Sequence, residues 1–344
     1  MQTTDLSGTR LYQKTLGCLL GGIIGDAIGT PTEGWDYRRI EEHYGWVSDF
    51  SGDGTDDTVM KNLLAEALIR TGGYATLDDW AQVWIDHWSD IFGDKYGKFF
   101  ISVIAAAQKV KHQGVPRMAA LGNLPSSSSA MCISPVGIVN ACNPTQAALQ
   151  AYNLGSLIHA YDVGFCQDGA AAMAAAVAAA MKPDANVESV LEAATGAIIK
   201  LSGCEMLDRI EAAMQLARTA KDYKTFRSGV YEASDRFFCR LICDSRETIP
   251  LTLALFYLAQ GDLEQCVTYG ANLGRDSDTI GSMAGAIAGA LGGATAVKSE
   301  WASKVQSLTK VDQEELATRL VEVAVAKQRS ERAAQALFNQ IASP

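Results

Sequence analysis

The sequence predicts an all-α fold, built as a single compact domain of orthogonally packed helices. In most segments of the 344-residue chain, apolar residues recur every three or four positions, which is the spacing of one helix face. The alternation typical of strands is weak throughout, and no stretch rich in proline, glycine and serine is long enough to separate domains. We expect one domain over residues 1–344, with a core from about 11 to 297 and a C-terminal helix from about 312 to 341.

The first helices follow from apolar periodicity. Residues 11–29 include the apolar stretch LGCLLGGIIG, which runs into Asp26 and is shorter than the ~20 residues needed to span a bilayer. We therefore interpret it as a buried helix. Residues 58–70 combine helical periodicity with a charged face. Residues 77–89 carry Trp80, Trp84 and Trp88 four positions apart, which indicates a core-facing helix.

The remainder of the chain continues the helical pattern. The segment 114–129 is predicted to be irregular, and 132–139 could be extended, although proline and glycine interrupt that region. Helices are predicted over residues 145–160, 168–181, 187–202, 205–219, 225–243, 248–259, 262–272, 278–297 and 312–341.

Two of these helices carry glycine at every fourth position. One set is Gly17, Gly21, Gly25 and Gly29, and the other is Gly281, Gly285, Gly289 and Gly293. Each glycine inside a helix costs roughly 1 kcal/mol relative to alanine. We interpret both sets as sites of tight helix crossing rather than direct ligand contacts.

Composition narrows the range of functions. The net charge of −10 and a pI near 5.0 argue against sequence-independent binding of nucleic acid, which requires a basic surface. The N-terminus lacks the layout of a signal peptide, and we expect no membrane association. The eight cysteines are scattered without a CxxC spacing, so zinc is not indicated. We predict a reduced, cytoplasmic protein.

Two similar acidic clusters stand about 220 residues apart, SGDGTDDTVM at 51–60 and GRDSDTIG at 274–281. Both precede predicted helices, so each could simply cap a helix N-terminus. Capping explains one aspartate in each cluster but not two. Carboxylate and threonine oxygens together suit magnesium, manganese or calcium. If the clusters meet in space, they could hold two cations that activate water.

A third candidate lies in GDAIGTPTEGW, residues 25–35, where a turn leaves the first helix. Glu33 sits in this turn. It is either an ordinary surface carboxylate or a loop carboxylate that reaches a metal or substrate.

With these residues the chain resembles the ADP-ribosylglycohydrolase family, which includes the dinitrogenase reductase-activating glycohydrolases and the ADP-ribosyl-arginine and ADP-ribosyl-serine hydrolases. Three motifs match in order, Gly21–Gly34, Gly52–Met60 and Gly274–Gly293, and SSSSAMCISPVG at 126–137 matches more weakly. The resemblance covers residues 13–295 and lies in the combination of motifs.

The resemblance implies an all-α fold with a central binuclear site for two divalent cations, magnesium first and manganese as the alternative. The implied substrate is a small molecule that contains ADP-ribose or another ribosyl group, or an ADP-ribosylated protein. Hydrolysis would occur at the anomeric carbon, with the metals binding the ribose hydroxyls and orienting water. Glu33 resembles a mobile acidic residue near the scissile bond, and either Glu33 or Asp57 could accept the proton. The implied metal ligands are Thr55, Asp56, Asp57, Asp276, Asp278 and Thr279, and the implied substrate contacts are Ser127, Ser128, Ser129, Met131 and His159.

The sequence departs from the family pattern at Arg275, where many members have glycine. This guanidinium could fill space that a large substrate needs, bind a phosphate or carboxylate of the substrate, or pair with a ligand aspartate. The serine run at 126–129 also replaces a more glycine-rich loop. His159 could equally be a core histidine.

Three hypotheses follow. The chain is a metal-dependent ADP-ribosyl hydrolase, a hydrolase of a smaller N-riboside or nucleoside-like compound, or a non-catalytic ADP-ribose-binding member of the fold. The intact acidic set argues against the third, and binding of ADP-ribose would separate the first two.

Overall fold

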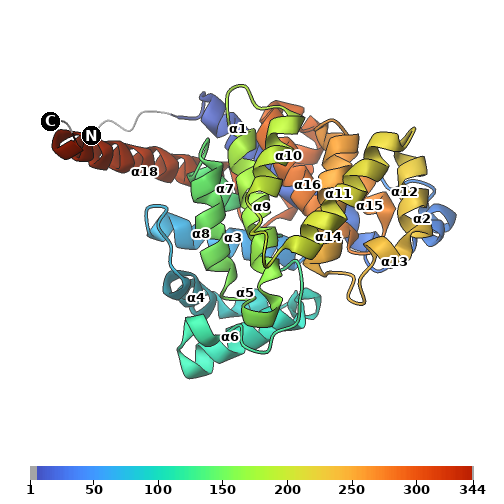
Figure 1. Ribbon diagram of the computed structural model, residues 1–344, viewed down its shortest axis with the longest axis horizontal. Coiled ribbons are helices and arrows are strands. Elements are labelled where there is room, and N and C mark those ends of the chain that lie inside the picture. The colour runs from blue at the N-terminus through green and yellow to red at the C-terminus, as the bar shows by residue number, and fades with distance from the viewer. Residues whose placement is uncertain (1–5, 343–344) are drawn as a thin grey trace.

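Two glycine-rich helices, α1 (Arg10–Gly29) and α16 (Ser277–Gly292), lie against each other within the body of the molecule (Figure 1). Their facing glycines form three pairs, Gly17 with Gly289, Gly21 with Gly285 and Gly25 with Gly281. A methyl group added at any of these positions would lie within 3.0 Å of backbone atoms of the opposite helix. The two helices therefore touch through their backbones, which confirms the prediction of a tight crossing.

The structure is a computed structural model that describes residues 6–342, and within this range it contains helices and loops but no β-strand. The all-α prediction is therefore confirmed. The other helices surround α1 and α16 (Figure 1), and they are α2 (Tyr37–Tyr44), α3 (Asp56–Arg70), α4 (Leu77–Asp86), α5 (Trp88–Phe92), α6 (Ile101–Gln113), α7 (Ser134–Val139), α8 (Pro144–Gly155), α9 (Phe165–Ala180), α10 (Val187–Gly196), α11 (Cys204–Thr219), α12 (Tyr223–Glu232), α13 (Ser234–Phe237), α14 (Ser245–Leu258), α15 (Leu263–Leu273), α17 (Ser299–Leu308) and α18 (Gln313–Ala342).

Local chemistry explains where several of these helices begin. The side chain of Thr9 accepts a hydrogen bond from the backbone N–H of Tyr12 at the start of α1. Thr76 and Asp79 form a reciprocal capping box at the start of α4. Helix α9 is built mostly of alanine, and these small side chains let it pack closely against α8, α10 and α16.

A buried lysine joins the helices behind the central pair. The Nζ atom of Lys14 donates to the backbone carbonyls of Ala180 at 2.7 Å, Ala290 at 3.0 Å and Leu291 at 2.9 Å. These carbonyls lie at the C-terminal ends of α9 and α16, where backbone acceptors lack helical partners and the helix dipole is negative. Lys14 therefore fixes α1 to the ends of two other helices.

The structure differs from the sequence predictions in several places. The predicted helix 77–89 is interrupted at His87, and the one at 225–243 divides into α12 and α13. The predicted helix 187–202 ends at Gly196. Residues 132–139 were considered for extended structure, but Ser134–Val139 is helical because Pro135 stands in the first turn, where proline is tolerated. Sequence periodicity also missed helices α2, α6 and α17.

One continuous cluster of buried side chains extends from Tyr12 to Val321. It supports the prediction of a single domain, which stays a prediction. The C-terminal half of α18 projects from the body (Figure 1), and its last buried residue is Lys327. Among the described residues, no helix is both long and apolar enough to cross a membrane.

Candidate functional site

The two acidic clusters meet where α3 and α16 begin. Asp56 and Asp57 open α3, while Asp276 and Asp278 stand at the start of α16. The four residues are only between 2% and 7% exposed. Thr279 Oγ1 donates to Asp57 Oδ2 at 3.2 Å, which connects the two clusters directly. The structure therefore brings together the residues proposed as metal ligands.

Asp26 on α1 organises the first cluster. Its buried carboxylate accepts from Thr55 N at 2.8 Å and Thr58 N at 3.1 Å, and from Thr55 Oγ1 at 2.9 Å and Thr58 Oγ1 at 2.6 Å. Thr55 makes no side-chain cap of its own, so Asp26 caps α3 from another helix. Because the Thr55 hydroxyl donates to Asp26, its lone pairs remain available to a cation.

Glu33 is positioned by the second cluster. The loop that carries it pairs with the loop before α16, since Gly34 N donates to Arg275 O at 2.7 Å and Arg275 N donates to Trp35 O at 2.9 Å. This pairing brings carboxylate oxygens of Glu33, Asp276 and Asp278 within 4.8 Å of one another. The side chain of Glu33 is 34% exposed, so it forms the solvent-facing edge of the cluster.

The carboxylates of the acidic cluster have few positive charges near them. Burial raises the pKa values of Asp57, Asp276 and Asp278 well above the usual range for aspartate, and neighbouring carboxylates raise them further. The same two causes raise the pKa of Asp56 to about 7. Within residues 6–342, none of these four forms a salt bridge with lysine or arginine.

Two buried oxygens in the cluster lack any hydrogen-bond partner, Asp57 Oδ1 and Asp278 Oδ1. Buried acceptors are normally satisfied, so these two atoms point to a missing positive partner. The donors are carboxylates and threonine hydroxyls, which are hard oxygen ligands. The residues present therefore fit divalent cations.

The serine loop lies against the second cluster. Ser127 Oγ donates to Asp276 Oδ2 at 3.2 Å, and Ser127 N donates to Cys243 O at 2.6 Å. The sequence predicted Ser127, Ser128, Ser129 and Met131 as substrate contacts, and the structure buries all four, with Ser127 in contact with the acidic cluster.

His159 packs against the serine loop, and its ring nitrogens contact that loop rather than the acidic cluster. It is fully buried, with its ring nitrogens 2.9 Å from the hydroxyl oxygens of Ser126 and Ser129. Burial lowers its pKa to about 3, so the ring is neutral. This geometry favours the core-histidine alternative, in which His159 holds the loop in shape.

Arg275 pairs with a carboxylate outside the acidic cluster. Its Nε and one terminal nitrogen each lie 2.8 Å from a carboxylate oxygen of Glu247, a completely buried residue on α14. The guanidinium also stacks on Phe238, with its carbon 4.2 Å from the ring centre. Arg275 has φ +60°, an unfavourable value for a non-glycine residue, and this bidentate pair stabilises it there. The partner differs from the ligand aspartate considered from sequence.

Comparison with known proteins identifies this arrangement. Residues 7–330 match the sequence pattern of the ADP-ribosylglycohydrolase family. The chain belongs to the ADP-ribosylglycohydrolase family. This membership supports glycohydrolase activity.

Relatives of this ADP-ribosylglycohydrolase family member cover most of its length. It is 28% identical over 354 aligned residues to the uncharacterized protein YegU of Escherichia coli K12, covering 94% of this chain and 99% of YegU. It is 26% identical over 359 aligned residues to the ADP-ribosylhydrolase ARH3 of Danio rerio, covering 93% of each chain. A solved structure titled ADP-ribosylglycohydrolase-related protein complex has the same fold, with a TM-score of 0.69 at 20% identity and coverage of 92% and 99%.

Three site residues of this family member were missed from sequence. Asp26 could have been found, because it is a lone acid in a stretch of small and apolar residues. Glu247 pairs with Arg275, and Lys98 donates to Glu33 at 3.1 Å. Neither carries a local signal, because each partner lies far along the chain.

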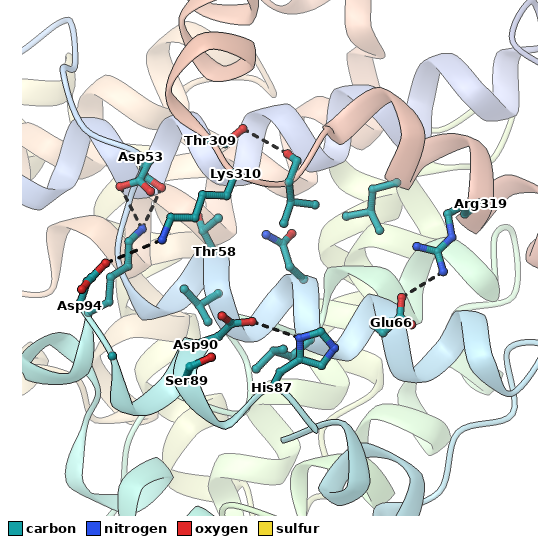
Figure 2. A pocket seen from close by; sticks show the side chains of 17 residues that line it. Asp53, Thr58, Glu66, His87, Ser89, Asp90, Asp94, Thr309, Lys310 and Arg319 are labelled. Atoms are coloured by element: carbon teal, nitrogen blue, oxygen red, sulfur yellow. Dashed lines mark hydrogen bonds and ion pairs between the residues drawn. The ribbon is translucent and has the colours of Figure 1, made fainter. Parts of the chain in front are cut away.

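A surface cavity of about 670 Å³ is lined by residues of α3, of the segment 87–95 and of the segment 309–319 (Figure 2), and by none of the four cluster aspartates. Its charged rim is already paired internally, as Arg319 with Glu66 at 3.1 Å and His87 with Asp90 at 3.2 Å. No lining residue was predicted from sequence as a site residue.

Proposed function

We propose that this chain hydrolyses the bond at the anomeric carbon of ribose in an ADP-ribosyl compound, with two divalent cations as cofactors, magnesium first and manganese as the alternative. The observation that carries the proposal is the group of four buried carboxylates with two unpartnered oxygens. The proposed metal ligands are Thr55, Asp56, Asp57, Asp276, Asp278 and Thr279.

Bound cations would supply positive charge that orients the ribose hydroxyls and a water molecule. The chain's own carboxylates would stabilise the positive charge that develops on the ribose as the bond breaks. Glu33 is better placed than Asp57 to transfer a proton, because Glu33 is solvent-facing while Asp57 is 2% exposed and bonded to Thr279. We therefore assign proton transfer to Glu33 and metal binding to Asp57.

The surface next to the serine loop supports a nucleotide substrate. Tyr161 is 62% exposed, and its hydroxyl lies 3.7 Å from the sulfur of Met118, which is also exposed. Leu121 and Leu124, which lie between Met118 and the serine loop in the sequence, are also exposed. An exposed apolar patch beside a polar wall suits a flat base attached to a polar backbone.

The relatives named ADP-ribosylhydrolase favour an ADP-ribosylated protein or an ADP-ribose derivative as substrate. An Arg275 side chain that filled space in the site would have favoured the smaller ribosides. The Arg275 guanidinium instead contacts Glu247, so it gives no reason to restrict the site to them.

The test is calorimetric titration of ADP-ribose into the protein with magnesium, repeated after chelation. We expect metal-dependent binding that Asp278→Asn weakens by about 100-fold or more, since even residues supporting a metal ligand contribute 10–100-fold. Asp53→Asn is the control, because it also removes one carboxylate charge near the site, but from the loop before α3, where Asp53 is paired with Lys95 at 3.0 Å. Absent binding by metal-loaded protein would refute the ADP-ribosyl substrate.

A further inference from the structure

A single lysine stands at the mouth of the acidic cluster. Lys98 ends the short 3₁₀ turn Tyr96–Lys98, and its Nζ atom donates to Glu33 Oε2 at 3.1 Å. The side chains are 43% and 34% exposed, so this ion pair borders solvent. Partial burial lowers the pKa of Lys98, but the charges of Glu33, Asp278 and Asp56 outweigh that effect and raise it. The ammonium group is therefore charged at neutral pH.

The other cations near the cluster are engaged elsewhere. Arg275 is held by Glu247, and Lys95 donates to the backbone carbonyls of Asp53 and Gly54. Lys61 is buried and donates to Leu19 O. Among the described residues of this neighbourhood, Lys98 is the cation that an incoming substrate would meet.

Lys98 and the serine loop contact different carboxylates of the cluster. Ser127 contacts Asp276, whereas Lys98 contacts Glu33. If the nucleotide part of the substrate follows the serine loop and the apolar surface beside it, the group on the other side of the anomeric carbon lies toward Glu33 and Lys98. Lys98 therefore faces the leaving group.

We propose that Lys98 determines substrate class by selecting ADP-ribosyl groups attached through a neutral or anionic leaving group, such as a hydroxyl oxygen, against those attached to a guanidinium. This inference rests on the function proposed above. A guanidinium would be repelled by Lys98 and would compete with it for Glu33, whereas a hydroxyl oxygen leaves the pair intact.

The favoured reaction balances without a further reactant. The bond between the anomeric carbon and the leaving oxygen breaks, and a bond between that carbon and the water oxygen forms. Glu33 takes one proton from the water and passes it to the departing oxygen, so the products are a free hydroxyl and ADP-ribose. Lys98 can donate a hydrogen bond to the departing oxygen as negative charge develops there.

The experiment compares two peptides that carry ADP-ribose on serine or on arginine. We expect the wild type to prefer the serine-linked peptide in kcat/KM, and Lys98→Met to shift this ratio toward arginine by about tenfold, as for loss of one charge–charge contact. Lys98→Arg keeps the charge and should keep the ratio. Lys111→Met is the control, because it also removes one positive charge. Lys111 is on α6 and contacts the Trp88 ring of α5 rather than the acidic cluster. The affinity for free ADP-ribose should be the same in all variants.

The outcomes separate this inference from the proposed function. An unchanged ratio in Lys98→Met with normal ADP-ribose affinity, or a wild type that prefers the arginine-linked peptide, would overturn the role of Lys98 alone. No ADP-ribose binding together with no hydrolysis of either peptide would refute both.

Discussion

Replacing Gly285 by alanine tests whether the backbone contact between α1 and α16 holds the two acidic clusters in register. The added methyl would lie well inside 3.0 Å of Gly21 O, and 2.8 Å from Val267 Cγ1. Ordinary contact begins at 3.4 Å, so the helices would have to separate by roughly 1 Å. A rotamer change of Val267 could relieve only its own contact, because Gly21 O and Gly21 C belong to the backbone.

The expected loss of stability follows from two opposing terms. Alanine gains about 1 kcal/mol in helix propensity, while overpacking of this kind costs about 1–3 kcal/mol and sometimes more. Because the clash is with backbone, we expect the upper end of that cost and a net destabilisation of about 2 kcal/mol. The shift of α16 would also displace Asp278, and metal sites tolerate about 0.2 Å in ligand distance. Magnesium-dependent stabilisation should therefore weaken as well.

Urea unfolding and thermal melts with and without magnesium measure both effects. Gly196→Ala is the matched control, because Gly196 ends α10 with nothing within 4 Å of the added methyl. It should leave stability equal or slightly higher. A Gly285→Ala protein that unfolds like the wild type and keeps its magnesium response would refute the backbone-contact argument.

Three further predictions concern the surroundings of the site. Asp26→Asn should lower magnesium affinity about 10–100-fold in titrations, because it weakens the cap on α3; unchanged affinity would contradict that role. Arg275→Gly should cost about 2–4 kcal/mol in urea unfolding, because buried Glu247 loses its cationic partner while glycine relieves the positive φ, and an equally stable variant would contradict this. His159 stays neutral in the folded state to about pH 3, whereas in the unfolded chain it takes up a proton below 6.5. The free energy of unfolding should therefore fall as pH falls from 6.5 toward 3. His159→Gln should make the free energy of unfolding less dependent on pH over this range. The same pH dependence in wild type and variant would contradict this account of His159.

The sequence revealed the parts of the site that local chemistry requires. The glycine sets of α1 and α16 predicted close helix crossing, because repeated glycines inside helices are costly without a packing reason. The doubled aspartates predicted a cation site, since capping needs only one acid. Neither pattern indicates that the glycines of α1 pack against those of α16, although this contact brings the two acidic clusters together.

Other features depend on contacts that no local pattern encodes. The Arg275–Glu247 and Lys98–Glu33 pairs join residues distant in sequence, so their charges look like ordinary surface charges. Residues 132–139 misled the interpretation because proline and glycine were read as interruptions, whereas Pro135 starts a helix. The buried environment of His159 was likewise invisible until the serine loop was placed around it.

The pairing of α1 with α16 also constrains how the protein is made. Ribosomes add roughly 5–20 residues per second, so α1 precedes its partner by tens of seconds during synthesis. For that period α1 lacks the glycine-lined surface of α16, so its Gly17, Gly21 and Gly25 have no helix packed against them. Contacts between such distant segments form slowly. The nascent chain therefore needs protection from aggregation, and no partial product that ends before α16 can assemble the cluster of carboxylates.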